Sequence, residues 1–226
     1  SIIVLFWTLA VYLYVLPPGR ARSSGVIALG VTGLMTGEMV LLLMQAARGT
    51  TSHFNNKTVF DGAVFSAMGL LILVNTLLFV YLTYLYFRTP PTGLPRAMVW
   101  GLRLGLIVFL LASAEGGYMS AQTGHAVGAA DGSAGLPLVN WSTEAGDLRI
   151  AHFVGMHGLQ AIPLFALMLV LLQKRFAPVR ATALTVVFSL IYTAAFTLVF
   201  VQALRGRPLL GRQIIVSQQA DDTKSK

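Results

Sequence analysis

Long apolar runs separated by short polar segments fill the chain as far as about residue 206. A membrane-spanning helix needs roughly 20 mostly apolar residues, because each residue adds about 1.5 Å along the helix axis. Five runs meet this requirement and predict spanning helices near residues 25–47, 59–87, 97–120, 148–172 and 181–203. A shorter run at residues 2–16 predicts another helix, which we expect to belong to a truncated or processed first span. The apolar core of a signal peptide is the alternative for this run.

Proline and glycine mark the connections between these helices. The segments at residues 17–19 and 90–95 contain prolines, which lack the amide donor that a helix needs. The one long connection, residues 121–146, is rich in Gly, Ala and Ser, and we expect an ordered loop that folds back over the helix ends. Asp147 is the predicted N-cap of the next helix. The pattern therefore predicts an all-α polytopic bundle of about six helices over residues 1–206, followed by an interfacial segment and disordered tail at residues 207–226.

Composition supports a membrane protein and excludes several other classes. The chain is 56% hydrophobic and 11% charged, whereas soluble domains carry about 25% charged residues. The absence of cysteine excludes disulfide scaffolds, thiolate zinc sites and cysteine nucleophiles. A net charge of +8 would suit nucleic acid only if the basic residues clustered on a soluble face. They are scattered between apolar runs, so the lipid bilayer is the predicted partner and nucleic acid is not.

The charged residues also predict an orientation. Alternating helix directions place the loops near residues 17–24, 88–96 and 173–180 on one membrane side. With Arg103, which lies in the next helix within snorkelling distance, this side receives eight Lys and Arg residues and no Asp or Glu. The opposite side receives eight basic and all eight acidic residues. The positive-inside rule places the first side in the cytoplasm.

Histidines and membrane-embedded carboxylates gather toward the opposite side. Glu38 lies roughly 15 Å along its helix from Arg48. Glu115 lies in the last turns of the predicted helix at residues 97–120. A carboxylate in a membrane segment marks function by default, so both are candidates for proton handling. His157 is predicted at nearly the depth of Glu38, which makes a contact between them across helices possible. Hydrogen bonding within the bundle is the alternative role for each residue.

Four histidines are candidate metal ligands: His53, His125, His152 and His157. Imidazole and carboxylate groups suit zinc, iron or copper. His152 and His157, with Arg149, are also candidate cofactor-binding residues for haem b or a quinone. The two histidines are about 140° apart around one helix, so they do not point at a single ion. Arg149 opposes the helix dipole in the first turn, which predicts an acidic partner or an anionic head group beside it.

Several segments resemble those of an uncharacterised group of bacterial multi-pass inner-membrane proteins. The segments are residues 48–55, 124–137, 140–142, 147–160 and 202–209. The resemblance implies a bacterial inner-membrane setting and brings no activity, cofactor or catalytic residue with it. A short internal echo also relates residues 45–49 to residues 202–206, and similar helix ends explain it better than an internal repeat.

The leading functional hypothesis is a membrane protein whose His and carboxylate cluster binds a metal ion or haem and serves redox or quinone-linked chemistry. One alternative is a non-catalytic subunit that packs against other membrane subunits or against copies of itself. Another is a metal-dependent membrane hydrolase, against which the adjacency of Ser52 and His53 in a turn argues. Whether the protein is an enzyme is left open by the sequence.

Overall fold

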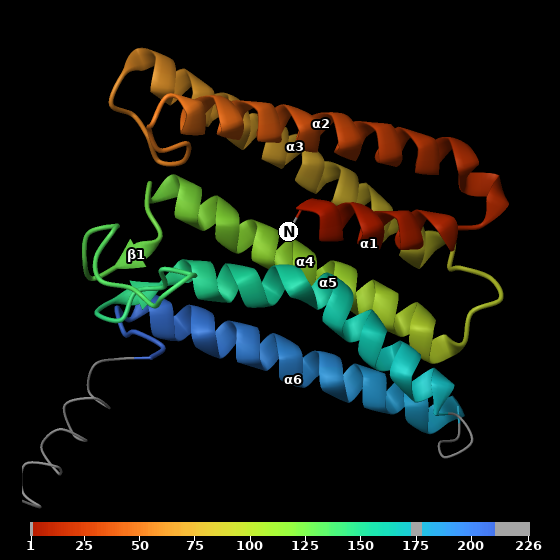
Figure 1. Ribbon diagram of the computed structural model, residues 1–226. Helices are drawn as coiled ribbons and strands as arrows, with labels where there is room; N and C mark the ends of the chain where they lie inside the picture. Colours follow the sequence, from red (N-terminus) through yellow and green to blue (C-terminus); the bar gives the residue numbers. More distant parts are fainter. Residues whose placement is uncertain (1, 173–177, 211–226) are drawn as a thin grey trace, which may run out of the picture.

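The computed structural model describes residues 2–172 and 178–210, and within them the chain is predominantly helical (Figure 1). The helices are α1 (Ile2–Tyr14), α2 (Ala21–Ala47), α3 (Val59–Arg88), α4 (Arg96–Ala121), α5 (Leu148–Leu171) and α6 (Pro178–Leu204). Helices α2 to α6 are long and apolar enough to cross a membrane, whereas α1 is shorter. The predicted all-α, multi-pass bundle is confirmed. Of the predicted interfacial segment and tail, residues 211–226 lie outside the described residues.

The connection between α1 and α2 differs in detail from the sequence prediction. Helix α1 ends at Tyr14, and the 3-10 turn η1 (Pro18–Arg20) leads directly into α2, which begins at Ala21 instead of residue 25. The amide of Arg20 donates to the carbonyl of Pro17 at 2.8 Å and closes this turn. Proline is tolerated at the first helical positions because the amides there have no intrahelical partner. The two prolines therefore reverse the chain and start the next helix at once.

Small residues let α4, α5 and α6 approach closely. A Cβ added to Gly155 on α5 would lie 2.6 Å from the Cβ of Ala112 on α4 and 2.8 Å from the ring of Phe196 on α6. A Cβ added to Gly101 on α4 would lie 2.7 Å from the Cβ of Ala166 on α5. Glycine and alanine at such contacts are the usual means by which membrane helices pack. These three helices form one side of the bundle, and the α2–α3 hairpin forms the other (Figure 1).

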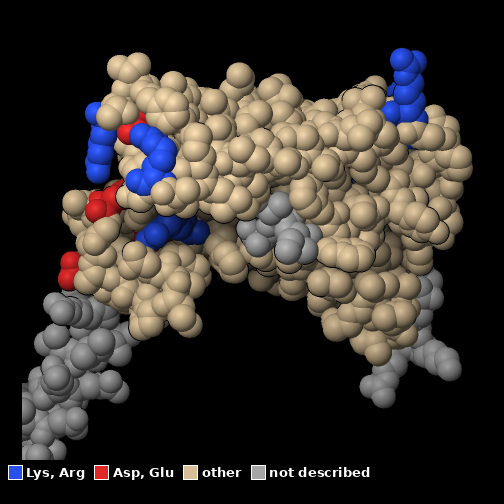
Figure 2. Space-filling model, turned by 45° about the horizontal axis from the view of Figure 1, so that its top comes forward, with Lys and Arg blue, Asp and Glu red and all other residues tan. Residues whose placement is uncertain are grey.

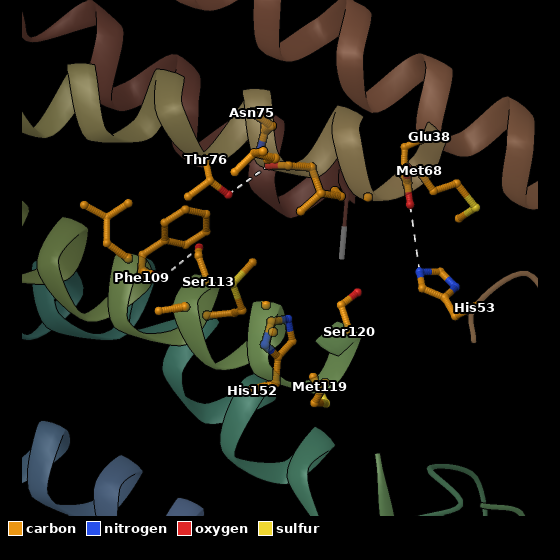
Figure 3. Close-up of a pocket in the computed structure, with 18 of the residues that line it drawn as sticks. Glu38, His53, Met68, Asn75, Thr76, Phe109, Ser113, Met119, Ser120 and His152 are labelled. Atoms are coloured by element: carbon orange, nitrogen blue, oxygen red, sulfur yellow. Dashed lines mark hydrogen bonds and ion pairs between the residues drawn. The ribbon is translucent and has the colours of Figure 1, made fainter. Parts of the chain in front are cut away.

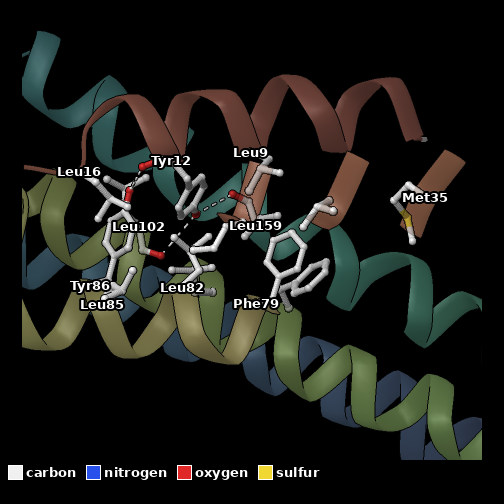
Figure 4. Packing of buried hydrophobic residues seen from close by; sticks show 14 residues of the cluster. Leu9, Tyr12, Leu16, Met35, Phe79, Leu82, Leu85, Tyr86, Leu102 and Leu159 are labelled. Atoms are coloured by element: carbon white, nitrogen blue, oxygen red, sulfur yellow. Dashed lines mark hydrogen bonds between the residues drawn. The ribbon is translucent and has the colours of Figure 1, made fainter. Parts of the chain in front are cut away.

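Helix α1 lies between these two sides and is held by tyrosine hydroxyls (Figure 4). Tyr12 donates to the carbonyl oxygens of Leu159 on α5, at 3.0 Å, and of Leu102 on α4, at 3.3 Å. Tyr86 on α3 donates to the backbone carbonyl of Tyr12 at 2.7 Å. Both tyrosines are buried within the main hydrophobic cluster of the bundle. Helix α1 thus links the α2–α3 hairpin to α4 and α5.

The connections sort into two ends of the bundle, as the sequence predicts. We call the end formed by residues 48–58, 122–147 and 205–210 the polar end, and the end formed by residues 15–20 and 89–95 the basic end. In the face shown in Figure 2, the acidic side chains cluster at the polar end, and only basic side chains mark the opposite end. Most of the third predicted basic loop, residues 173–177, lies outside the described part of the chain.

A charged network closes the α2–α3 hairpin at the polar end. Arg48 donates to the carboxylate of Asp61 at 2.6 Å, and Gln45 donates to the same carboxylate at 3.0 Å. Thr58 caps α3 by accepting from the amide of Asp61, and its hydroxyl donates to the Asp61 carboxylate at 2.7 Å. Asp61 is buried, so this network satisfies a charge that would otherwise be costly in the bundle.

The long connection forms an ordered cap over the polar end, as expected. Strands β1 (Ala126–Val127) and β2 (Gly146–Asp147) pair antiparallel within it. Asp131 accepts hydrogen bonds from the amides of His125 and Ala126. A Cβ at Gly146 would lie 1.9 Å from the carbonyl oxygen of Ala203, so this backbone packs directly against the last turn of α6.

The internal echo is explained by two equivalent helix ends. Gly49 and Gly206 both adopt left-handed backbone angles, with φ of 67° and 68°. The next amide in each case donates back to the carbonyl five residues earlier, of Gln45 and of Gln202. This is the Schellman arrangement, which favours glycine because the left-handed region excludes most side chains. The echo therefore reflects a shared way of ending a helix.

Candidate functional site

A cavity of about 620 Å³ lies between the α2–α3 hairpin and helices α4 and α5, toward the polar end (Figure 3). Leu5, near the start of α1, forms part of its wall. Its apolar walls include Met35, Met68 and Phe109. Its polar lining comprises Glu38, His53, Asn75, Thr76, Ser113, Ser120 and His152. Two of the predicted metal-ligand histidines and one predicted proton-handling carboxylate therefore share one cavity.

Glu38 and His53 form the first polar group of this cavity. Glu38 is 6% exposed on α2, and its Oε1 lies 3.9 Å from Nε2 of His53. Its Oε2 is buried without a hydrogen-bond partner among the described residues. The Nδ1 of His53 lies 2.9 Å from the hydroxyl of Ser52. Burial lowers the pKa of His53, which favours its neutral form.

His152 and Glu115 form the second polar group. The Nδ1 of His152 on α5 lies 2.9 Å from Oε2 of Glu115 on α4 and 3.1 Å from the carbonyl oxygen of Ala112. Gly116 provides the space, because a Cβ there would lie 2.7 Å from Cε1 of the imidazole. Glu115 is 4% exposed. In the tautomer that donates Nδ1–H to Glu115, Nε2 of the ring is left as a hydrogen-bond acceptor.

Asn75 is a polar cavity residue that the sequence analysis did not select. It lies on α3 in an otherwise apolar stretch, and it is 5% exposed. Its Oδ1 is buried and has no hydrogen-bond partner within the part of the chain described. Buried amides in proteins are nearly always hydrogen-bonded, so a lone buried oxygen beside a cavity is unusual. An asparagine within a predicted membrane span was the sequence signal that could have identified it.

His157 does not reach Glu38 in the structure. The Nδ1 of His157 lies 2.8 Å from the carbonyl oxygen of Phe153 on its own helix, and the two rings lie 4.2 Å apart. His157 is absent from the cavity lining, whereas His152 is part of it. The predicted angular separation of the two histidines explains this, because it turns His157 away when His152 faces the cavity. Glu38 instead has His53 as its histidine neighbour.

His125 and Arg149 belong to the cap. The Nδ1 of His125 lies 3.6 Å from Asp131 and 3.7 Å from Asp147. Arg149 donates from Nε and Nη2 to the buried carboxylate of Asp147, and from Nη2 to the carbonyl of Asn140. The predicted acidic partner of Arg149 is therefore Asp147. The predicted N-cap is also present, since Asp147 accepts from the amide of Arg149 at 3.0 Å.

The hydrogen bonds around Asp147 hold it ionised. Burial raises its pKa, but the hydrogen bonds from Arg149 and from the amide of Ser142, with the positive charge of Arg149, outweigh this and leave the pKa below its ordinary value. Arg149 thus has a structural role at the start of α5, where its bonds fix the cap to the helix that carries His152.

The predicted metal and haem ligands do not form one donor set. Among residues 2–172 and 178–210, no group of three His, Asp or Glu side chains is arranged to hold a metal ion. His53 and His152 lie at the cavity, His125 lies in the cap, and His157 packs against Phe153. The described residues therefore give no support to a metal ion, to haem b or to the metal-dependent hydrolase alternative. The chain matches no protein-family model, no curated protein and no solved structure.

Proposed function

We propose that this multi-pass membrane protein binds a lipophilic molecule of the quinone or quinol class in the cavity between the α2–α3 hairpin and helices α4 and α5, and exchanges protons with it through two carboxylate–histidine pairs. The observation that carries the proposal is one cavity lined by Glu38, His53 and His152, with Glu115 held against the far nitrogen of His152. Ionisable groups at membrane depth are costly and mark function by default. Apolar walls with a few convergent polar groups are typical of small-molecule sites.

The unpartnered polar atoms suit such a head group. Oε2 of Glu38 and Oδ1 of Asn75 are buried without partners in the described residues. A quinol hydroxyl donates to a carboxylate, an amide oxygen or a neutral imidazole nitrogen, whereas a quinone carbonyl accepts from a protonated carboxyl, an amide NH₂ or a protonated imidazole. The same residues therefore hydrogen-bond both forms of the head group when their protons shift. Oxidation of a bound quinol to the quinone releases two protons and two electrons. In this proposal the protons pass to the two carboxylate–histidine pairs and the electrons to a haem or iron–sulfur centre on another membrane subunit.

Exposed residues at the edges of the cavity would let an apolar ligand enter from the bilayer. Leu73 and Val80 on α3 line the cavity and are 56% and 46% exposed. Ala114 and Gly117 on α4 also line it and are exposed. A methionine-rich apolar wall adapts to an isoprenoid chain, because methionine is flexible and polarizable. This arrangement supports a membrane-soluble ligand in preference to a water-soluble one.

Protons would leave the cavity toward the polar end, through His53. His53 follows α2 in the connection to α3, and it contacts Glu38 on one side and Ser52 on the other.

The proposed setting is a bacterial inner membrane with the basic end in the cytoplasm, which places this proton exchange on the opposite side. Because the chain contains no cysteine, labelling of Thr92→Cys and Ser133→Cys by an impermeant maleimide in intact cells tests the orientation. Labelling of Thr92→Cys alone would reverse it.

The test of the proposed function is binding of a photoreactive quinone analogue to the full-length protein in native membranes. Glu38→Gln, Asn75→Leu and His152→Asn should each reduce cross-linking at least about tenfold, since one lost hydrogen bond to a polar head group is worth about 1.5 kcal/mol. His157→Asn is the matched control, because it changes the same residue type on the same helix outside the cavity. Equal cross-linking in all four variants would overturn the proposal.

A second measurement tests whether the cavity is open. Ser113→Cys lies in the cavity wall, and a membrane-permeant maleimide should label it, with at least tenfold slower labelling in the presence of excess quinone analogue. A cysteine that resists the maleimide without added quinone would mean that polypeptide fills the cavity, and would contradict the proposal. A cysteine labelled equally fast with and without the analogue would contradict it too.

A further inference from the structure

The cap contains a tight hairpin at residues 134–143 that holds an apolar tip in a fixed position. The amide of Leu136 donates to the carbonyl of Trp141 at 2.8 Å, and the amide of Asn140 donates to the carbonyl of Leu136 at 2.8 Å. The amide of Thr143 donates to the carbonyl of Ala134 at 3.0 Å, next to an isolated β-bridge between Gly135 and Ser142. These bonds define the conformation of the tip, residues 137–141.

Leu138 occupies an unfavourable position at this tip. Its φ is 71°, in the left-handed region that non-glycine residues rarely adopt, and its side chain is fully exposed. Val139 beside it is 46% exposed. Strained backbone persists where the surrounding structure imposes it and often has a function. Asparagine or glycine would suit this backbone and water better than leucine, so the sequence at this position favours a contact that the isolated chain does not provide.

The base of the tip packs against an exposed surface of α5. Trp141 packs edge-on against Phe153, with ring centroids 5.7 Å apart, and the ring of Phe153 lies 4.2 Å from that of His157 in a tilted arrangement. Phe153 is 51% exposed. It lies five residues after Leu148, hence roughly 8 Å along α5 from its first residue. The hairpin therefore folds back beside the first turns of α5, and the ends of membrane-spanning helices are where tryptophan side chains gather.

A hydrogen bond fixes this position. Nη2 of Arg149 donates to the carbonyl of Asn140, and the same guanidinium is held by the buried carboxylate of Asp147 at the start of α5. The tip is thus tied to the first turn of the helix, and it does not project freely into water. From the strained, exposed leucine, the aromatic contact with the exposed surface of α5 and this tie, we infer that residues 137–141 form an interfacial anchor that inserts Leu138 and Val139 among the lipid head groups and upper acyl chains.

The test uses the absence of native cysteine, with an environment-sensitive fluorophore attached at Leu138→Cys in the purified protein in lipid nanodiscs. Ala134→Cys is the matched control, since it is an exposed residue at the base of the same hairpin. We expect the label at position 138 to emit at shorter wavelength, to be at least threefold less quenched by aqueous iodide than the label at position 134, and to be quenched by spin-labelled lipid near the head group.

Equal iodide quenching at the two positions would overturn the inference. A label at position 138 that is shielded from iodide and also from spin-labelled lipid would mean that a second copy of the chain covers the tip, and would overturn it as well. Leu138→Asn provides an independent measurement, because asparagine tolerates the left-handed backbone. This variant should keep or raise the melting temperature in detergent and lose the stabilisation that the parent protein gains on transfer into nanodiscs. A lower melting temperature in detergent would show that Leu138 serves the fold, in conflict with the anchor.

Discussion

The hydroxyl of Tyr12 donates a hydrogen bond to the carbonyl oxygen of Leu159 at 3.0 Å, and this carbonyl is the one that Pro163 leaves without a helical partner. Proline has no amide proton, so the carbonyl four residues earlier loses its usual donor. Figure 1 shows α5 bending along this stretch. The tyrosine of α1 thus satisfies an acceptor that the proline of α5 creates, and the two helices depend on each other.

Removal of that hydroxyl should destabilise the bundle. Tyr12→Phe leaves the buried carbonyl of Leu159 without a donor, which costs about 1 to 3 kcal/mol in proteins. We expect a lower melting temperature in detergent, measured by tryptophan fluorescence. Pro163→Ala restores an amide donor to the same carbonyl, so Tyr12→Phe should cost less in that background. A purely additive double mutant would show that the two residues act independently.

Substitution of Gly146 should detach the cap from α6. A Cβ there would meet the carbonyl oxygen of Ala203 at 1.9 Å, and backbone atoms on both sides limit the adjustment. Gly146→Ala should destabilise the fold by about 3 kcal/mol, at the upper end of the usual range for overpacking. Gly33→Ala is the matched control, because a Cβ at Gly33 on α2 meets nothing within 4 Å. Thermal unfolding measures both, and a similar loss in the control would refute the steric explanation.

Arg48 and Arg205 follow equivalent helix ends but should differ in their contribution to stability. Arg48 pairs with the buried carboxylate of Asp61, whereas Arg205 is exposed at the end of α6. Arg48→Ala would leave the buried carboxylate of Asp61 with only the neutral donors Gln45 and Thr58, so we expect a clearly lower melting temperature. Arg205→Ala should stay within about 0.5 kcal/mol of the parent, as surface substitutions do. Equal melting temperatures for the two variants would contradict the role given to the Arg48–Asp61 pair.

Stability should fall as the pH drops below about 6.5, the ordinary pKa of histidine, in part because of His125. Burial lowers the pKa of His125, and Arg149 adds to this effect, while Asp131 and Asp147 partly oppose it. The unfolded chain therefore binds a proton at higher pH than the folded protein does, so the free energy of unfolding decreases through this range and levels off below the folded pKa. His125→Gln should reduce the slope of melting temperature against pH. An unchanged slope would exclude this histidine as its source.

Periodicity and residue chemistry were sufficient to predict the helices, some of the helix ends and several local contacts. Runs of about 20 apolar residues form spanning helices because only a helix satisfies its own backbone polar groups in lipid. The cap of α5 by Asp147, the acidic partner of Arg149 and the similar endings at Gly49 and Gly206 all involve residues a few positions apart. Such contacts follow from local geometry, so a sequence pattern can indicate them.

The partners of the membrane-embedded groups could not be deduced in this way. Glu115 meets His152 from 37 positions away, and Glu38 meets His53 in place of the expected His157. No residue spacing reveals that Tyr12 donates to the carbonyl that Pro163 leaves without a helical partner. Nor does any spacing show that Asn75 lies at the cavity with Glu38. Helix rotation and lateral order decide these contacts, and both depend on how small residues such as Gly101 and Gly155 let particular faces approach. The sequence by itself determined that the chain spans a membrane and where its polar groups gather, because hydropathy and charge act locally, whereas the tertiary packing of the helices alone decided which histidine meets which carboxylate.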